Sequence, residues 1–146
     1  QSYLNKYGFI KQSKVKFLIG EDSVWKKKDQ YLVIGKGKFN SWANMAEVGL
    51  SNAGTATEQI VGLGIPSLSL PGPGPQFTKS FAKRQSRLLG GSVLVCKNKK
   101  ILLKRLSLLL KRKVDRLEQA KIGKKRMGES GASKKIADAI NLHLLS

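Results

Sequence analysis

The segment Leu50 to Gln59, which reads LSNAGTATEQ, has the residue types of a phosphate-binding turn. It begins as the end of a strand, continues through small residues at 52–54 and then opens a helix on threonines. Small side chains let an anion come close to the backbone, and the first N–H groups of a helix have no internal partner. Because the helix dipole adds partial positive charge at this end, the pattern predicts a diphosphate site that needs no lysine.

Two kinds of side chain add to the predicted site. The hydroxyls of Thr55 and Thr57 are candidate donors to phosphate oxygens, and the Glu58 carboxylate is a candidate acceptor for both hydroxyls of a ribose. A purely structural interpretation is the alternative. In it, Gly54 and Thr55 turn the chain and cap the helix, and Glu58 completes a capping box. The sequence leaves both interpretations open.

The loop Pro71 to Gln76, PGPGPQ, follows another predicted strand and is stiff, because half of its residues are proline. A special connection at the ligand-binding edge of a sheet favours a functional loop. A rigid linker is the alternative interpretation.

Short apolar runs alternate with helical patterns along most of the chain. Strands are predicted at residues 15–20, 31–35, 47–51, 66–70 and 92–96, with the polar stretch Glu21 to Gln30 connecting the first two. Helices are predicted at residues 55–62, 77–89, 99–112, 113–127 and 133–145, the last one after a break at Gly128 to Gly131. This alternation predicts an α/β fold with a Rossmann-like parallel sheet and helices on both faces. Such sheets bind ligands beyond the carboxyl ends of their strands, which is where Ser51 lies.

The size of the chain, 146 residues, predicts one domain. Because it begins at Gln1 without a methionine or a signal sequence, we expect it to be an internal piece of a longer chain. Its single cysteine, Cys96, permits neither an internal disulfide nor a cysteine-based metal site, so a reducing, cytoplasmic compartment is expected. The apolar stretch Ile101 to Leu110 is interrupted by Lys104 and Arg105 and is far shorter than the ~20 residues that cross a bilayer.

The net charge of +19 implies an anionic partner, such as nucleic acid, a membrane surface or phosphorylated substrates. The charge is unevenly distributed: residues 41–75 contain no lysine or arginine, whereas Lys97 to Arg126 contain thirteen. This basic run carries leucines along one side, which fits either a helix at the anionic inner face of a membrane or a helix packed on the sheet. No aromatic residue follows Phe81, so stacking of nucleic-acid bases on this region is disfavoured.

Few reactive side chains remain outside these segments. Lys79, Lys83 and Arg87 form a basic stripe at four-residue spacing, which either is solvated or faces a phosphate or an acidic lipid. His143 is the only histidine and Cys96 the only cysteine. No metal cluster, cofactor or nucleophilic triad is therefore expected, and the catalytic residues remain unknown.

Residues 51–90, SNAGTATEQIVGLGIPSLSLPGPGPQFTKSFAKRQSRLLG, resemble the donor-binding region of GT-B glycosyltransferases, and most closely that of lipid-A-disaccharide synthase-related proteins. The similar pattern runs from about Phe39 to the closing RMGESGASKKIADAI, some two-thirds of the chain. The resemblance implies two facing Rossmann-like domains, of which the C-terminal one mainly holds a nucleotide-sugar. This chain would be that C-terminal domain.

The resemblance also implies roles for single residues. Gly54, Thr55, Ala56 and Thr57 match the loop and helix start that hold the donor diphosphate, and Glu58 matches the ribose-binding glutamate.

Two further positions match outside this loop. Gln76 corresponds to a polar position that reaches the donor sugar, and Phe39 falls where related enzymes border the uracil ring. The PGPGP stretch is longer than the corresponding connection of other GT-B enzymes. The match of Gln76 to the sugar-binding position therefore depends on how this stretch is aligned.

Together, these observations predict a domain that binds a UDP-sugar for hexosyl transfer to an acceptor, with a lipid-linked acceptor as one option. The acceptor domain is expected upstream of Gln1, so these residues alone should be inactive. The alternative is a non-enzymatic basic module that binds nucleic acid or anionic membrane through Lys97 to Arg126.

Overall fold

A computed structural model describes residues 2–13, 21–75 and 77–144, and the chain divides into two compact units, Gln1–Met45 and Ala46–Ser146. Each unit is built on a sheet of its own, and the expectation of a single domain stays a prediction. The strand predicted at 15–20 lies outside the described residues.

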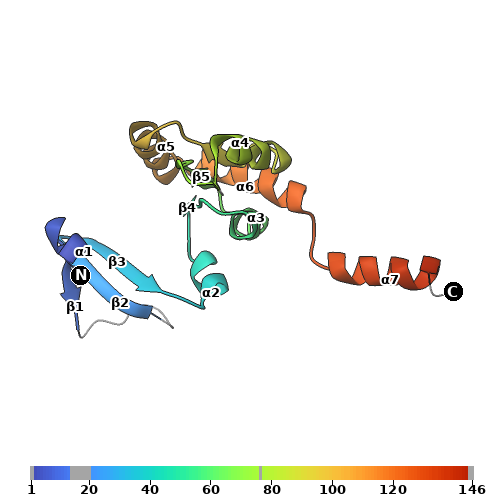
Figure 1. Cartoon of the computed structure of the whole chain (residues 1–146), viewed down its shortest axis with the longest axis horizontal. Helices are drawn as coiled ribbons and strands as arrows, with labels where there is room; N and C mark the ends of the chain where they lie inside the picture. Colours follow the sequence, from blue (N-terminus) through green and yellow to red (C-terminus); the bar gives the residue numbers. More distant parts are fainter. Residues whose placement is uncertain (1, 14–20, 76, 145–146) are drawn as a thin grey trace. The chain divides into compact units, whose positions relative to one another are not determined.

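The first unit contains an antiparallel sheet in the order β1-β2-β3 (Figure 1). Its elements are α1 (Ser2–Lys6), β1 (Ile10–Gln12), β2 (Glu21–Lys27), β3 (Gln30–Gly35) and α2 (Phe39–Ala43). β3 contains the strand predicted at 31–35. The prediction that this strand joins a parallel sheet is wrong, because β3 follows β2 directly through a tight turn and can pair with it only antiparallel.

β2 replaces the polar connection predicted at residues 21–30. Two adjacent residues within it, Val24 and Trp25, are 2% and 4% exposed, and Trp25 lies opposite Leu32 of β3. The ammonium group of Lys26 lies 5.2 Å from the centroid of the Tyr31 ring on the neighbouring strand. Contacts between the strands thus stabilise β2, although its charged residues alone are unfavourable for a strand.

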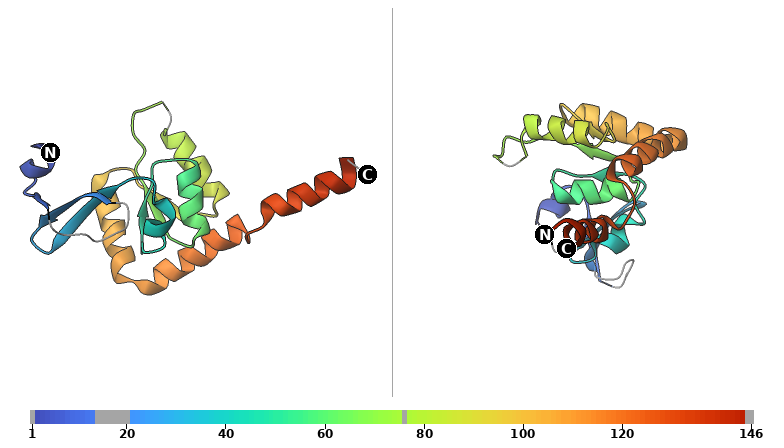
Figure 2. Two further views of the ribbon diagram at one scale, coloured as in Figure 1. Left: turned by 90° about the horizontal axis from the view of Figure 1, so that it is seen from below. Right: turned by 90° about the vertical axis from the view of Figure 1, so that its right-hand side faces the viewer.

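The second unit is an α/β structure with a parallel sheet of three strands, flanked by helices (Figures 1 and 2). Its strands, in the order β4-β5-β6, are β4 (Gly49–Leu50), β5 (Ser67–Ser69) and β6 (Val93–Val95). Its helices are α3 (Thr55–Gly62), α4 (Lys79–Leu88), α5 (Lys99–Lys111), α6 (Lys113–Met127) and α7 (Ala132–Leu144). The predicted mixed α/β fold with a parallel sheet is confirmed for this unit.

Two apolar clusters cover the two faces of the parallel sheet. The first joins α3, the end of α4 and β6 through Val61, Leu89 and Val93. The second joins β5, β6 and α5, and its buried members are Leu68, Cys96 and Leu109. Val93 and its neighbour Leu94 belong to opposite clusters, because successive side chains of a strand point to opposite faces.

The leucines of α5 fall into two groups. Leu109 is buried, and Leu102 and Leu106 pack against the same cluster. Leu103 and Leu110, which belong to the leucines predicted along one side of the basic run, are 62% and 50% exposed. The helix packs on the sheet through only part of its leucine-rich surface. Among the described residues, no helix is both long and apolar enough to cross a membrane.

α6 packs against α3 (Figure 2), and Gly123 lies at this contact. A Cβ atom at Gly123 would lie 2.7 Å from Val61 Cγ1 and 2.9 Å from the Val61 carbonyl oxygen. Both distances are too short for a carbon atom, and the carbonyl belongs to the backbone of α3. A glycine inside α6 therefore sets the separation of the two helices.

We expect Gly123→Ala to destabilise the protein by about 1–3 kcal/mol, because the added methyl group forces α6 away from α3. Gly62→Ala is the matched control, since a Cβ at Gly62 would meet the Met127 side chain at an ordinary 3.6 Å. The control should be neutral or stabilising by up to about 1 kcal/mol, as helix propensity predicts. Urea unfolding followed by circular dichroism measures both effects, and a stabilised Gly123→Ala protein would contradict this account.

Candidate functional site

The three parallel strands end at one edge of the sheet, and the loops that follow them meet there. Backbone hydrogen bonds extend the pairing past the strand ends: Ser51 N–H donates to the Leu68 carbonyl at 2.9 Å, and Cys96 N–H donates to the Ser69 carbonyl at 2.8 Å. The loop after β4 is therefore fixed to the central strand at its first residue.

Two side chains position the rest of this loop. Asn52 Oδ1 accepts a hydrogen bond of 2.8 Å from the backbone N–H of Leu70, at the end of β5. Gln85 of α4, only 4% exposed, donates from Nε2 to the Gly54 carbonyl at 3.0 Å. That carbonyl also accepts from the N–H of Thr57 at 3.0 Å and from the N–H of Glu58 at 3.3 Å. The loop is thus held by both the sheet and α4.

The N-terminus of α3 has no side-chain cap. Gly54 occupies the N-cap position and has no side chain to accept a hydrogen bond. Within the described part of the chain, the N–H groups of Gly54, Thr55 and Ala56 have no acceptor. Gly54 thus takes the N-cap position, as the structural alternative expects, but the side-chain cap and the capping box of that alternative are not formed among the described residues. Three donors at the positive end of the helix dipole are free for an anion.

Thr57 has a structural role that its sequence position does not reveal. Its side chain is fully buried, and its hydroxyl donates to the Ala53 carbonyl at 2.6 Å and shares a second hydrogen bond of 2.6 Å with Ser51 Oγ. The predicted donation from this hydroxyl to a phosphate therefore conflicts with its internal bonds. Thr55 is exposed, so its hydroxyl remains a candidate donor.

The Glu58 carboxylate is half-buried in the first turn of α3. None of the described residues forms a hydrogen bond or an ion pair with it. A carboxylate without an internal partner can accept both hydroxyls of a diol. This arrangement is compatible with the predicted ribose contact.

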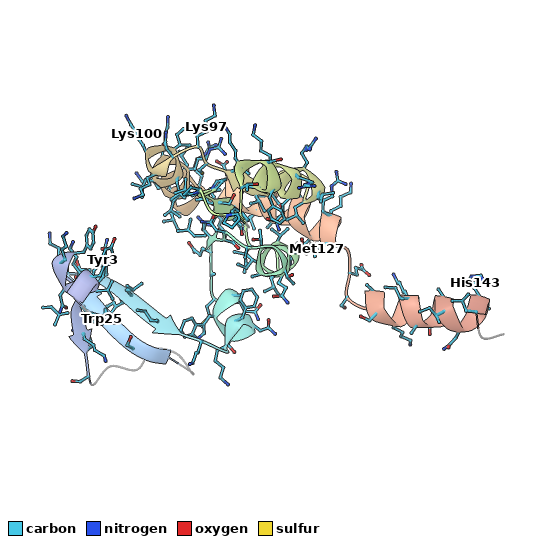
Figure 3. The ribbon with its side chains drawn as sticks, viewed as in Figure 1. Tyr3, Trp25, Lys97, Lys100, Met127 and His143 are labelled. Carbon is cyan, nitrogen blue, oxygen red and sulfur yellow. The ribbon has the colours of Figure 1, made fainter. Side chains whose placement is uncertain are left out.

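Two cavities open at the carboxyl edge of the sheet. The first, about 350 Å³, is lined by Asn52, Leu70, Gly72, Gly74, Pro75 and Phe77. The second, about 220 Å³, is lined by Pro71, Gly72, Lys79, Lys83, Val95, Cys96 and Lys97. The proline-rich loop borders both cavities, and Lys97 lies at the rim, where its side chain extends outward (Figure 3). Of the loop after β4, Asn52 lines the first cavity, whereas Gly54 to Glu58 are not among the described residues that line either one.

The structure does not test the two remaining predicted contacts. Gln76 lies outside the described residues. Phe39 is the first residue of α2 in the other compact unit, where it is 38% exposed. Its contact with a uracil ring stays a prediction.

The role of Gln85 in holding the loop was not predicted, although the sequence contains a signal for it. It lies on the buried face of α4 between Ala82 and Leu89, where an apolar residue is expected. A polar side chain at such a position needs a buried partner, which here is the Gly54 carbonyl. Its Oε1 atom and Ser69 Oγ are buried without a partner among the described residues.

Cys96 lines the second cavity but is a poor nucleophile. Its side chain is 1% exposed, and burial raises the pKa of the thiol, with an opposing influence from the nearby Arg105 charge. The sulfur is consequently protonated at neutral pH. In the described ranges, no three histidine, cysteine or acidic side chains are grouped so that they could hold a metal ion.

Comparisons with protein-family models, curated proteins and solved structures found no match for this chain. The resemblance to GT-B glycosyltransferases therefore rests on the quoted residues alone.

The two threonines in the first turn of α3 are expected to respond differently to the same substitution. Thr57→Val should destabilise the protein by about 1–3 kcal/mol, because it leaves Ser51 Oγ and the Ala53 carbonyl without their partner. Thr55→Val, at an exposed position, should change stability by less than about 0.5 kcal/mol. Equal thermal midpoints for the two variants would refute the structural role of Thr57.

Proposed function

We propose that the second unit binds a UDP-sugar as the donor domain of a glycosyltransferase. The observation that carries the proposal is that, at the N-terminus of α3, three backbone donors and a carboxylate lie together without a partner among the described residues. Gly54, Thr55 and Ala56 supply the donors, and Glu58 supplies the carboxylate. These are the groups that a diphosphate and an adjoining ribose require.

The position of this turn in the fold supports the proposal. It follows β4 at the carboxyl edge of a parallel sheet, where ligands of open α/β sheets usually bind. Gln85 and Asn52 hold the loop from two sides, so the donors are arranged before a ligand arrives. Preorganised donors stabilise charge without the cost of reorienting during the reaction.

In the proposed reaction, the bond between the sugar and the diphosphate breaks, and negative charge develops on the leaving UDP. The α3 N–H groups stabilise that charge, and Glu58 holds the ribose in place. This chain is proposed to supply donor binding only. The acceptor site and the base that activates the acceptor hydroxyl would belong to a second domain, so residues 1–146 alone would bind UDP weakly and turn over no substrate.

Isothermal titration of the 146-residue chain with UDP tests the proposal. Glu58→Ala should weaken binding by roughly 10- to 100-fold, the equivalent of losing charged hydrogen bonds worth about 1.5–3 kcal/mol. Glu118→Ala is the matched control, because it removes the same charge from an exposed position on α6. The control should bind UDP as the unchanged protein does. A folded protein that shows no heat of binding with UDP would refute the proposal.

A non-enzymatic basic module acting through residues 97–126 is the competing function. It predicts binding to nucleic acid or anionic vesicles that is steeply salt-dependent and indifferent to both UDP and Glu58. Three of the α5 leucines that such a module would present to a membrane, Leu102, Leu106 and Leu109, instead pack on the sheet. This packing favours the donor-binding proposal.

A further inference from the structure

A large open cavity lies beside β6, the strand at one end of the described parallel sheet. Its volume is about 700 Å³, within the range of sites for small organic ligands. Residues of α4, β6 and the turn between them line it, together with Arg105 of α5. The lining residues are Ser80, Lys83, Ser86, Arg87, Gly91, Val93, Leu94, Val95 and Arg105.

Three cations face this cavity from two helices. Lys83 and Arg87 are exposed and lie one turn apart on α4, and Arg105 is half-buried on α5. Among the residues that the structure describes, no carboxylate lines the cavity and none of the three cations forms an ion pair. Like charges gathered around one space repel each other, and a bound anion removes that repulsion. Two arginines additionally match the geometry of phosphate oxygens.

The residues of β6 that line the cavity are apolar. Leu94 and Val95 are half-buried, whereas the Val93 side chain is buried in the cluster with Val61 and Leu89. Ser86 Oγ donates a hydrogen bond of 2.7 Å to the Val93 carbonyl, so one backbone acceptor of this edge strand is already occupied. An added peptide strand would need the free backbone edge. The cavity therefore favours a ligand recognised by side chains, with a charged group and a less polar part.

We propose that this cavity binds a phosphate-bearing ligand. Lys83, Arg87 and Arg105 hold the phosphate, and the less polar part of the ligand lies on β6. The site is separate from the proposed donor site, because none of the residues from Asn52 to Glu58 lines it. The phosphate can belong to a free metabolite or to a lipid headgroup, since both present the same group to the three cations.

The test compares two triple variants that lose equal charge. Lys83→Gln, Arg87→Gln and Arg105→Gln together remove the cations of the cavity. Lys111→Gln, Lys125→Gln and Lys135→Gln together remove three exposed cations that do not line it. The 146-residue chain is titrated with inorganic pyrophosphate by calorimetry, and its sedimentation with vesicles of phosphatidylcholine, with and without phosphatidic acid, is measured in parallel.

The cavity variant should bind at least one of the two probes at least about tenfold more weakly than the unchanged protein does. The control variant should bind that probe no more than about twofold more weakly. Selective loss of pyrophosphate binding would indicate a free phosphorylated ligand, and selective loss of vesicle binding would indicate a lipid headgroup. Equal weakening in both variants, or no binding of either probe by the unchanged protein, would overturn the proposal. If the triple variant does not fold, Lys83→Gln with Arg87→Gln, both at exposed positions, gives the same test against Lys111→Gln with Lys125→Gln.

Discussion

Backbone hydrogen bonds from the buried strand β5 determine the arrangement of the second unit. All three β5 residues are buried, so their N–H and carbonyl groups can be satisfied only by the neighbouring strands. The N–H of Ser51 donates to Leu68, and the N–H of Cys96 donates to Ser69, which places the ends of β4 and β6 at the same edge. Every loop proposed to bind a ligand begins from this edge.

α4 serves two different sites because its two faces have different chemistry. Its buried face carries Gln85, which holds the Gly54 carbonyl and so positions the start of α3. Its exposed face carries Lys83 and Arg87, which line the basic cavity beside β6. Residues two positions apart on a helix are rotated by about 200°, so one helix can separate an uncharged backbone site from a cationic one. Movement of α4 would therefore alter both sites.

Elements could be predicted from the sequence where their signals lie next to each other in the chain. Contacts between residues that are distant in the chain could not be predicted. The bounds of α3 agree with the prediction at 55–62, because a small-residue turn and a threonine-rich helix start lie next to each other in the sequence. β2 was missed because its lysines indicate a loop, and the tertiary contacts of Trp25 outweigh them. Gln85 and Gly54 are 31 residues apart, so no local pattern could show their hydrogen bond. The structural role of Thr57 was hidden for a related reason, since a hydroxyl suits a ligand and a buried neighbour equally well.

The two proposed sites would attract anions by different physical means. Backbone N–H groups at a helix start act over a short range, so they select a group that fits against them. The cations around the β6 cavity act over a longer range and are screened by salt, with a Debye length of about 8 Å at physiological ionic strength. A lysine beside Glu58 would pair with the carboxylate and remove the acceptor proposed for the ribose. The absence of basic residues from 41–75 is therefore consistent with a site in which Glu58 must remain unpaired.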